Sequence, residues 1–244
     1  MTQSSVHGSN LRRLHMGCGL TYLEGWINCD GAPSARLFTI LPKPLRSLLR
    51  KAGLVGRGTQ EFWQFLETHP ISYVNARKRW PFANESMDVI YSSHLIDCLS
   101  SAAVQAFFQE AFRVLKPGGR IRLAGMDLAR EVDIYCQDRD ARRLVALISQ
   151  PHPQDHGLLT RLRQAFLPTL AYRAQLDFGA YRSLLQDAGF QQIVHLQPGE
   201  TTIDHPHPIN LWQRHGESVY VEARKPRGGG QALAGTAPGA ERGR

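Results

Sequence analysis

Residues Leu11–Asp30 contain the residue types that a nucleotide site needs, in the order strand, glycine turn, strand and acid. Gly17, Cys18 and Gly19 follow an apolar strand, and the two glycines would let the backbone turn sharply and approach a ligand closely. Asp30 ends the second apolar strand, where a carboxylate could accept hydrogen bonds from both hydroxyls of a ribose. This stretch therefore predicts a nucleotide-binding turn followed by a ribose-binding acid.

The spacing argues against a dinucleotide. In the fingerprint Gly-x-Gly-x-x-Gly the third glycine is replaced here by Tyr22, and Asp30 comes well short of the usual spacing of about 20 residues. NAD is therefore disfavoured as a cofactor. The connection Leu20–Gly25 is also shorter than the dozen or so residues that parallel strands normally need, so either the first helix is a single turn or the strands have other limits.

A second polar group follows the short predicted strand Ile71–Val74. The side-chain oxygen of Asn75 could accept the amino group of an adenine, while the N–H of Ala76 meets a ring nitrogen. An asparagine at this place is equally typical of a plain turn. Both interpretations stay open on these residues alone.

His94 and Asp127 end two further predicted strands. Because the carboxyl ends of parallel strands meet at one edge of an open α/β sheet, we expect these side chains to lie near Asp30 and Asn75. A histidine has an unperturbed pKa near ~6.5, which suits proton transfer at neutral pH. The alternative role for His94 is a hydrogen bond to the strand end or to a cofactor. Asp127 and Tyr22 are weaker candidates for lining the same pocket.

The rest of the chain alternates strands with helices, which predicts an α/β fold ending in an antiparallel hairpin. The expected elements are a strand at Asp88–Ser93, a helix capped by Ser100 or Ser101 and stopped by Lys116–Gly119, a strand at Arg120–Ala124, a helix over Leu128–Ser149, a helix ending at Gly189, and strands at Gln191–Leu196 and Ser218–Ala223.

Composition places the chain among soluble, unexported proteins. No run of 18 or more apolar residues occurs, the N-terminus lacks the regions of a signal peptide, and the cysteines Cys18, Cys29, Cys98 and Cys136 have no metal-binding spacing. We therefore expect a cytoplasmic protein with no metal site and no disulfide framework. We expect one domain over residues 11–225, with insertions at about 31–70 and 150–174, a flexible N-terminus over 1–10 and a disordered tail over 226–244.

The formal net charge of +8 favours acidic partners, and part of it lies in the first insertion. Leucines near helical spacing stand there beside six bases and no acid. One interpretation is a basic amphipathic helix that touches a membrane or covers a phosphorylated substrate. The interpretation we favour is a helix that packs on the sheet with a solvated basic face. The residues concerned are Leu45, Leu48, Leu49 and Leu54, with Arg36, Lys43, Arg46, Arg50, Lys51 and Arg57.

With these elements in order, the chain resembles the class I S-adenosylmethionine-dependent methyltransferases of the bacterial type 11-like group. The matching stretches are HMGCG, GWINCD, the Trp80–Phe82 loop, MDVIYSSHLIDCL, FFQEAFRVLKPGGRIRLAGMDL, LLQDAGF and ESVYVEARKP. The resemblance covers roughly residues 11 to 225 and implies a Rossmann-like seven-stranded sheet, mostly parallel with an antiparallel terminal hairpin and helices on both faces.

The resemblance also implies roles for single residues. Gly17 and Gly19 would receive the amino-acid part of S-adenosylmethionine, and Asp30 would hold its ribose. Cys18 and Tyr22 would belong to the same cofactor site. Asn75 and Ala76 would line the adenine, and Ser92, Ser93 and His94 would border the methyl end. Where relatives often show His-x-x-Glu-His, this chain has His94-Leu95-Ile96-Asp97-Cys98. The second histidine of that motif is thus absent, and the role of Asp97 stays open.

The implied function is methyl transfer from S-adenosylmethionine to an oxygen or nitrogen of a small molecule, with His94 as the candidate base. The resemblance favours a sugar, a polysaccharide precursor or a natural product as acceptor. One alternative is a non-catalytic protein that keeps the cofactor fold and docks on membrane or nucleic acid through the basic insertion; an NAD-dependent oxidoreductase is less favoured. We do not expect nucleic acid as a substrate, because the fourth strand ends in Ser-Ser-His. Four histidines among prolines, His152, His156, His205 and His207, are expected in loops that cover the substrate.

Overall fold

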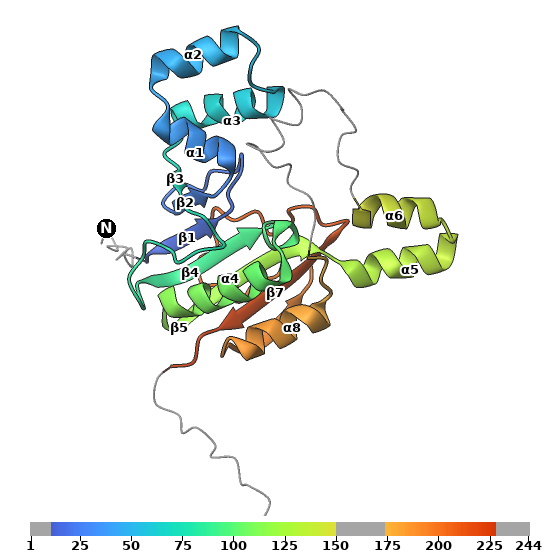
Figure 1. Cartoon of the computed structure of the whole chain (residues 1–244). Coiled ribbons are helices and arrows are strands. Elements are labelled where there is room, and N and C mark those ends of the chain that lie inside the picture. Colours follow the sequence, from blue (N-terminus) through green and yellow to red (C-terminus); the bar gives the residue numbers. More distant parts are fainter. Residues whose placement is uncertain (1–10, 150–173, 228–244) are drawn as a thin grey trace, which may run out of the picture.

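The computed structural model describes residues 11–149 and 174–227, which form one seven-stranded sheet (Figure 1). The strand order is β3-β2-β1-β4-β5-β7-β6. The four pairings from β3 to β5 are parallel, and β7 is antiparallel to both β5 and β6. The strands are β1 Arg13–Met16, β2 Ile27–Asp30, β3 Ser72–Tyr73, β4 Met87–Ser93, β5 Leu115–Met126, β6 Gln191–Leu196 and β7 Ser218–Arg224. The expected α/β sheet with a terminal antiparallel hairpin is confirmed.

The helices and strands follow the predicted order with three differences. No helix joins β1 to β2, so the alternative of a single-turn first helix is wrong. The helix expected over Leu128–Ser149 is two helices, because Arg139 adopts a left-handed conformation with φ 55°. Strand β5 begins at Leu115 and already includes the Lys116–Gly119 turn residues. The helices are α1 Pro33–Ile40, α2 Lys43–Lys51, α3 Arg57–Thr68, α4 Ser101–Val114, α5 Leu128–Asp138, α6 Ala141–Ser149 and α8 Phe178–Asp187, with a 3-10 turn η1 at Ile96–Cys98.

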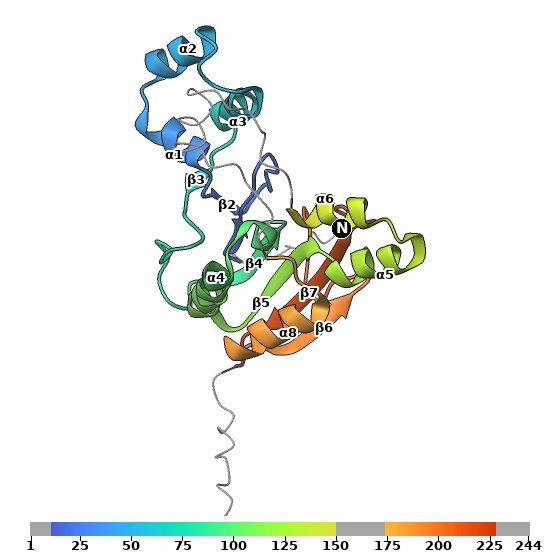
Figure 2. The same cartoon turned by 45° about the vertical axis from the view of Figure 1, so that its right-hand side comes forward.

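The two faces of the sheet are covered differently. Helices α4 and α8 pack on one face, where Phe107, Phe108 and Tyr181 join the main core (Figure 2). On the other face a second core contains Trp26 and Tyr91 together with loop residues of the segment 203–211. Loops therefore contribute much of that second core, and the segment before β7 is fixed against the sheet.

A buried ion pair holds that segment in place. Arg122 of β5 donates to Glu222 of β7 at 2.6 Å, and both side chains are 1% exposed. Arg122 also donates to the carbonyl of Glu200, and Glu222 accepts the N–H of Thr202 at 2.6 Å. Removing one partner of such a pair leaves an uncompensated buried charge, so the pair should be kept, and it holds residues 200–202 against β5 and β7.

Helices α1–α3 stand beyond β3, away from the centre of the sheet (Figures 1 and 2). Helix α1 carries a buried Ala35 and α3 buries Phe62 and Trp63, but α2 has no buried residue. The favoured interpretation of this insertion, a helix packed on the sheet, is therefore wrong for α2. The second insertion and the two terminal segments lie outside the described residues, apart from Ala174 and residues 226–227. Among the helices of residues 11–149 and 174–227, none is long and apolar enough to cross a membrane.

Candidate functional site

The glycine turn and Asp30 form one compact unit. Gly17 and Gly19 have φ angles of +72° and +52°, a region that glycine adopts at little cost. The N–H groups of Gly17 and Cys18 both donate to the carbonyl of Cys29, at 2.8 and 3.0 Å. The carboxylate of Asp30 accepts the N–H of Gly19 at 2.9 Å and that of Ala32 at 2.7 Å. Two backbone donors thus fix this acid at the carboxyl edge of the sheet.

Burial dominates the electrostatics of this unit. It raises the pKa of Asp30, and the hydrogen bonds from Ala32 and Gly19 only partly oppose it. Burial, followed by the charge of Asp30, raises the pKa of the Cys29 thiol to about 12 and also raises that of Cys18. Both thiols are free and neutral at physiological pH, so Cys18 acts here as a small packing residue.

Asn28 and His15 stabilise the connection between β1 and β2, in which no helix forms. Asn28 accepts the N–H of Leu23 at 3.0 Å and donates to the carbonyls of Leu23 and Trp26. His15 contacts the same Asn28 oxygen through Nδ1 at 3.1 Å, and burial lowers the pKa of His15 to about 4. The imidazole is therefore neutral at pH 7. Sequence periodicity could not predict this loop, because all three of these backbone hydrogen bonds are made by one residue, Asn28.

The segment after β3 lies directly against the Asp30 unit. A Cβ on Gly31 would come 2.7 Å from the carbonyl oxygen of Val74, and the N–H of Val74 donates to the carbonyl of Asp30 at 3.1 Å. Asn75 is thereby placed next to the acid, as expected. Its side-chain oxygen accepts the N–H of Arg77 at 2.9 Å, which is the contact of a turn residue. A carbonyl oxygen has a second lone pair, so this bond leaves it able to accept another donor.

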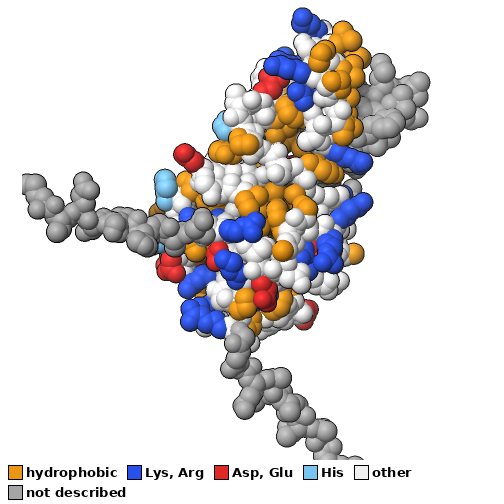
Figure 3. Space-filling model, turned by 90° about the vertical axis from the view of Figure 1, so that its left-hand side faces the viewer, with side chains coloured by type: hydrophobic (Ala, Val, Ile, Leu, Met, Phe, Trp, Pro, Cys, Tyr) orange, Lys and Arg blue, Asp and Glu red, His pale blue; other side chains and the backbone are white. Residues whose placement is uncertain are grey.

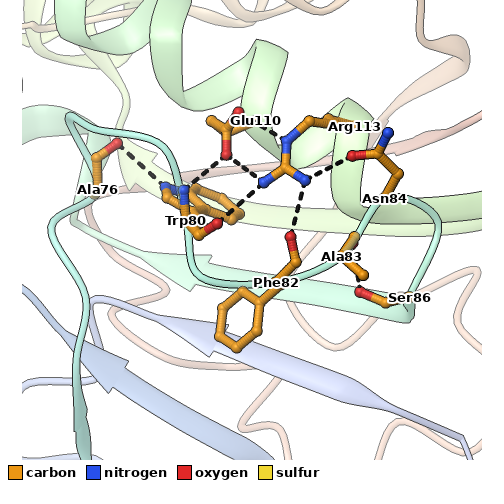
Figure 4. A network of polar contacts seen from close by, with 8 residues as sticks. All are labelled: Ala76, Trp80, Phe82, Ala83, Asn84, Ser86, Glu110 and Arg113. Atoms are coloured by element: carbon orange, nitrogen blue, oxygen red, sulfur yellow. Dashed lines mark hydrogen bonds and ion pairs between the residues drawn. The ribbon is translucent and has the colours of Figure 1, made fainter.

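A polar network on α4 anchors the loop that continues from Ala76 (Figure 4). Glu110 accepts the N–H of Trp80 at 2.8 Å and is bound by both Nε and Nη2 of Arg113. Arg113 also donates to the carbonyls of Trp80 and Phe82. The bidentate bond to Arg113 is the main reason why the pKa of Glu110 is lowered. The arginine in the stretch FRVLKPGG therefore has a structural role, which is to hold the Trp80–Phe82 loop.

His94 lies at the end of β4 between two polar partners. Its Nδ1 is 2.8 Å from Oδ2 of Asp97, and its Nε2 is 2.9 Å from Oγ of Ser218. A carboxylate only accepts, so the contact with Asp97 favours the tautomer with the proton on Nδ1, in which Nε2 accepts from the Ser218 hydroxyl. Asp97 has no exposed side-chain surface and also accepts the N–H of Met126. His94 is therefore oriented with its basic nitrogen toward the start of β7.

Tyr181 and Gly125 close the space around Asp97. A Cβ on Gly125 would come 2.2 Å from the Tyr181 hydroxyl and 2.9 Å from Oδ1 of Asp97. Burial, followed by the charge of Asp97, raises the pKa of Tyr181 well above its ordinary value. Only glycine fits at this position of β5, between the carboxylate and the phenol.

The glycine turn and the His94 group lie together at the edge. A Cβ on Gly17 would come 2.8 Å from the Cβ of Leu95, the residue that follows His94. Burial raises the pKa of the Cys98 thiol to about 11, and the charges of Asp97 and Asp30 both add to that increase. Cys98 therefore lies within electrostatic reach of both acids.

The other residues expected in the site differ in their surroundings. Ser92 is buried at the end of β4 and its hydroxyl has no hydrogen-bond partner in the described part of the chain. Ser93 is partly buried beside it. Tyr22 packs its ring against His69, with centroids 5.0 Å apart. Asp127 accepts the N–H of Arg130 as the N-cap of α5, so its contact is that of a helix cap.

The expectation that the four loop histidines cover the substrate fails for His207. Its carbonyl accepts from Arg13 at the start of β1, which is the opposite edge of the sheet. His205 is exposed, and His152 and His156 lie outside the described residues. Among residues 11–149 and 174–227 no group of three His, Cys, Asp or Glu side chains could hold a metal ion.

One family model matches part of this chain. Residues 50–123 match the model of a family described as a methyltransferase domain, and this range contains Asn75, Ser92, His94 and Asp97. No curated protein matches the chain.

Three of the solved structures that match the chain have TM-scores below 0.5. A chain from the complex between the Haloferax volcanii Trm112 methyltransferase activator and a methyltransferase has 13% identity and a TM-score of 0.46, with 90% of this chain and 84% of that chain covered. A Methanosarcina mazei S-adenosylmethionine-dependent methyltransferase has 15% identity and a TM-score of 0.46, with coverages of 88% and 92%. The CurJ carbon methyltransferase has 16% identity and a TM-score of 0.45, with coverages of 88% and 48%.

Proposed function

We propose that this chain, which carries a methyltransferase domain, transfers a methyl group from S-adenosylmethionine to an oxygen or nitrogen of a small molecule. The observation that carries the proposal is the position of His94. Its ring is held by Asp97 and Ser218 at the same sheet edge where Asp30 is fixed beside the glycine turn. Methyl transfer to an acceptor that carries a proton needs an acid that holds the ribose of the cofactor and a base that takes the proton, and Asp30 and His94 would supply these at one edge.

The residues present fit S-adenosylmethionine. Each Asp30 oxygen accepts one backbone N–H and keeps a further lone pair, so the carboxylate can still accept two ribose hydroxyls. Nothing lies within 4 Å of the position where a Cβ on Gly19 would be, which leaves room for a ligand at the turn. Ser92 supplies a buried hydroxyl near the end of β4 that has no partner among residues 11–149 and 174–227. We assign Asn75 and Ala76 to the adenine, and Gly17, Cys18 and Tyr22 to the amino-acid end.

The chain's own contribution to the reaction is mainly alignment. When bound, S-adenosylmethionine supplies an electrophilic methyl group, and holding an acceptor in line with it can supply about 7 to 11 kcal/mol of the barrier. The acceptor hydroxyl or amine would take the place of the Ser218 hydroxyl at Nε2 of His94. His94 would then remove the acceptor's proton as the new bond forms, while Asp97 keeps the opposite nitrogen protonated and stabilises the imidazolium.

The acceptor class we propose is a hydroxylated small molecule such as a sugar, a polysaccharide precursor or a natural product. Support comes from the group at Nε2 of His94, which is the neutral hydroxyl of Ser218, whereas the Asp97 carboxylate lies on the opposite side of the ring. A hydroxyl group can replace the serine hydroxyl at Nε2 without a change of charge at this position.

The test has two steps. Calorimetric titration with S-adenosylmethionine and S-adenosylhomocysteine, with NAD as the negative control, should show micromolar binding of the first two only. Formation of S-adenosylhomocysteine is then measured over a panel of sugars, phenols, amines and carbon nucleophiles such as β-ketoesters. Absence of binding of either adenosyl compound would overturn the proposal. Binding with turnover only on carbon nucleophiles would overturn the assignment to oxygen or nitrogen.

A further inference from the structure

Helix α2 is attached to the protein by its basic side. The guanidinium of Arg46 lies over the Phe38 ring, 3.8 Å from its centroid, and donates to the Phe38 carbonyl at 2.6 Å. Arg50, four residues later and so on the same side, is 3.5 Å from the carboxylate of Glu67 in α3. An amphipathic helix normally turns its leucines inward and its charges outward. In α2 two arginines face α1 and α3 instead.

Two leucines of α2 consequently face outward, since Leu48 is 60% exposed and Leu45 38%. Two apolar residues that flank the helix, Ile40 at the end of α1 and Leu54 after α2, are each 65% exposed. We call these four residues the leucine surface. Single exposed apolar side chains are ordinary, but here half of the eight large exposed hydrophobic residues in the described chain fall within fifteen positions. Figure 3 shows hydrophobic side chains gathered beside Lys and Arg at the upper end of the molecule.

The segment that carries the leucine surface contains bases and no acid, and its one acidic contact is that of Arg50 with Glu67 of α3 among the described residues. No acid occurs between residues 31 and 60, while six bases do. Lys43 and Lys51 are exposed at the two ends of α2, and no ion pair is recorded for either among the described residues. Exposed aliphatic side chains flanked by lysines fit a surface that is apolar below and anionic above.

We propose that α2 docks this protein on an anionic lipid bilayer, with the leucine surface inserted between headgroups and Lys43 and Lys51 on lipid phosphates. A lipid surface can bind both the apolar residues and the lysines. A nucleic acid would bind the lysines through its phosphates but would leave the leucines in water. The helix projects beyond β3, away from the rest of the sheet, so a flat surface can reach it (Figure 1). The proposal goes beyond the proposed methyl transfer and needs no turnover to be tested.

The test is flotation of the full chain with vesicles of phosphatidylcholine alone and of phosphatidylcholine with phosphatidylglycerol. Wild type should float only with the anionic vesicles. The variant Leu45→Gln/Leu48→Gln/Leu54→Gln should bind them at least tenfold more weakly, because burial of aliphatic side chains is lost. Lys43→Gln/Lys51→Gln should weaken binding by about fivefold per lysine and reduce its salt dependence. Val132→Gln on α5, another exposed aliphatic position, is the matched control and should bind like wild type.

Since the altered leucines are exposed, the variants should keep the thermal midpoint of wild type, which circular dichroism checks. Absence of wild-type binding to anionic vesicles would overturn the proposal, whatever the outcome of the cofactor titration. Equal binding by the leucine variant would also overturn it. Sedimentation that shows a wild-type dimer split by the leucine substitutions would assign the surface to a second copy, and a DNA shift lost only in the lysine variant would assign it to nucleic acid; either result overturns the proposal.

Discussion

Asp30 and His94 lie at the same edge of the sheet but are held by different kinds of contact. Both backbone donors to Asp30 come from within eleven residues of it, in the turn before β2 and the two residues after it. His94 depends on Asp97 in η1 and on Ser218, which is 124 residues away at the start of β7. The first half of the site is a local unit, whereas the second exists only when β7 has paired with β5. Substitutions at the two places should therefore fail in different ways.

The largest effect is expected at the assembled half. His94→Asn should lower turnover by about 10²- to 10⁴-fold, the usual contribution of a positioned base. Asparagine is chosen because His94 has φ 51°, a conformation that asparagine tolerates. Initial rates with the acceptor found in the panel measure the effect, and the dissociation constant of S-adenosylhomocysteine should stay within twofold of wild type.

Asp97→Asn sharpens the interpretation of His94. The amide can still accept from Met126, but it no longer fixes the proton on Nδ1, so the tautomer of His94 should change. Nitrogen chemical shifts of the ring report this directly without an acceptor. An unchanged tautomer together with full activity would show that Asp97 does not orient the base.

At the local half, Asp30→Asn should weaken S-adenosylhomocysteine binding by about 100-fold, since hydrogen bonds to a charged acceptor contribute about 1.5–3 kcal/mol each. Burial raises the pKa of Asp30, so wild-type affinity should begin to fall on acidification at a pH above the ordinary carboxyl range, and the Asn variant should lack this dependence. The pH dependence of stability that Asp30 causes runs in the opposite direction to that of affinity. A folded-state pKa above the unfolded value stabilises the protein at low pH, and this contribution is lost as pH rises through the folded pKa.

Asp127→Asn is the matched control for Asp30, because Asp127 is an acid at the same edge that caps α5 and asparagine caps a helix equally well. Titration calorimetry should give it the wild-type affinity. A similar loss in both variants would mean that the charge of the edge, and not a contact of Asp30, determines binding.

Two glycines should differ in their effect on stability when each is replaced by alanine. Gly125→Ala should lower the free energy of unfolding by about 3 kcal/mol, because its Cβ would overlap the Tyr181 hydroxyl at 2.2 Å between two buried groups. Gly19→Ala has open space but φ +52°, so it should cost only about 1–2 kcal/mol. Urea unfolding measures both. The reverse order of the two losses would contradict the close packing around Asp97.

The sequence could predict the fold and the local half of the site because both depend on short-range patterns. Alternating apolar residues gave the strands, and Gly17, Gly19 and Asp30 lie within one segment. Asp97 was left open and Ser218 was missed, because only the pairing of Met126 with Ser218 brings β7 to His94. The loop after β1 depends on Asn28, a single residue without a periodic signal. The outward leucines of α2 were unexpected because periodicity defines a helix's two sides but does not say which side packs.

Ser218→Ala should have the smallest effect. It removes a neutral hydrogen bond to Nε2 of His94, worth about 0.5–1.5 kcal/mol, and leaves Asp97 to hold the ring. If the acceptor hydroxyl replaces that of Ser218 during the reaction, the variant should keep turnover within about threefold and change the KM by a similar factor. Ser218→Thr, which keeps the hydroxyl but adds a methyl group, separates crowding from hydrogen bonding. A loss in Ser218→Ala as large as that in His94→Asn would instead place Ser218 on the path of the proton. The β7 strand would then supply a catalytic residue as well as a positioning contact.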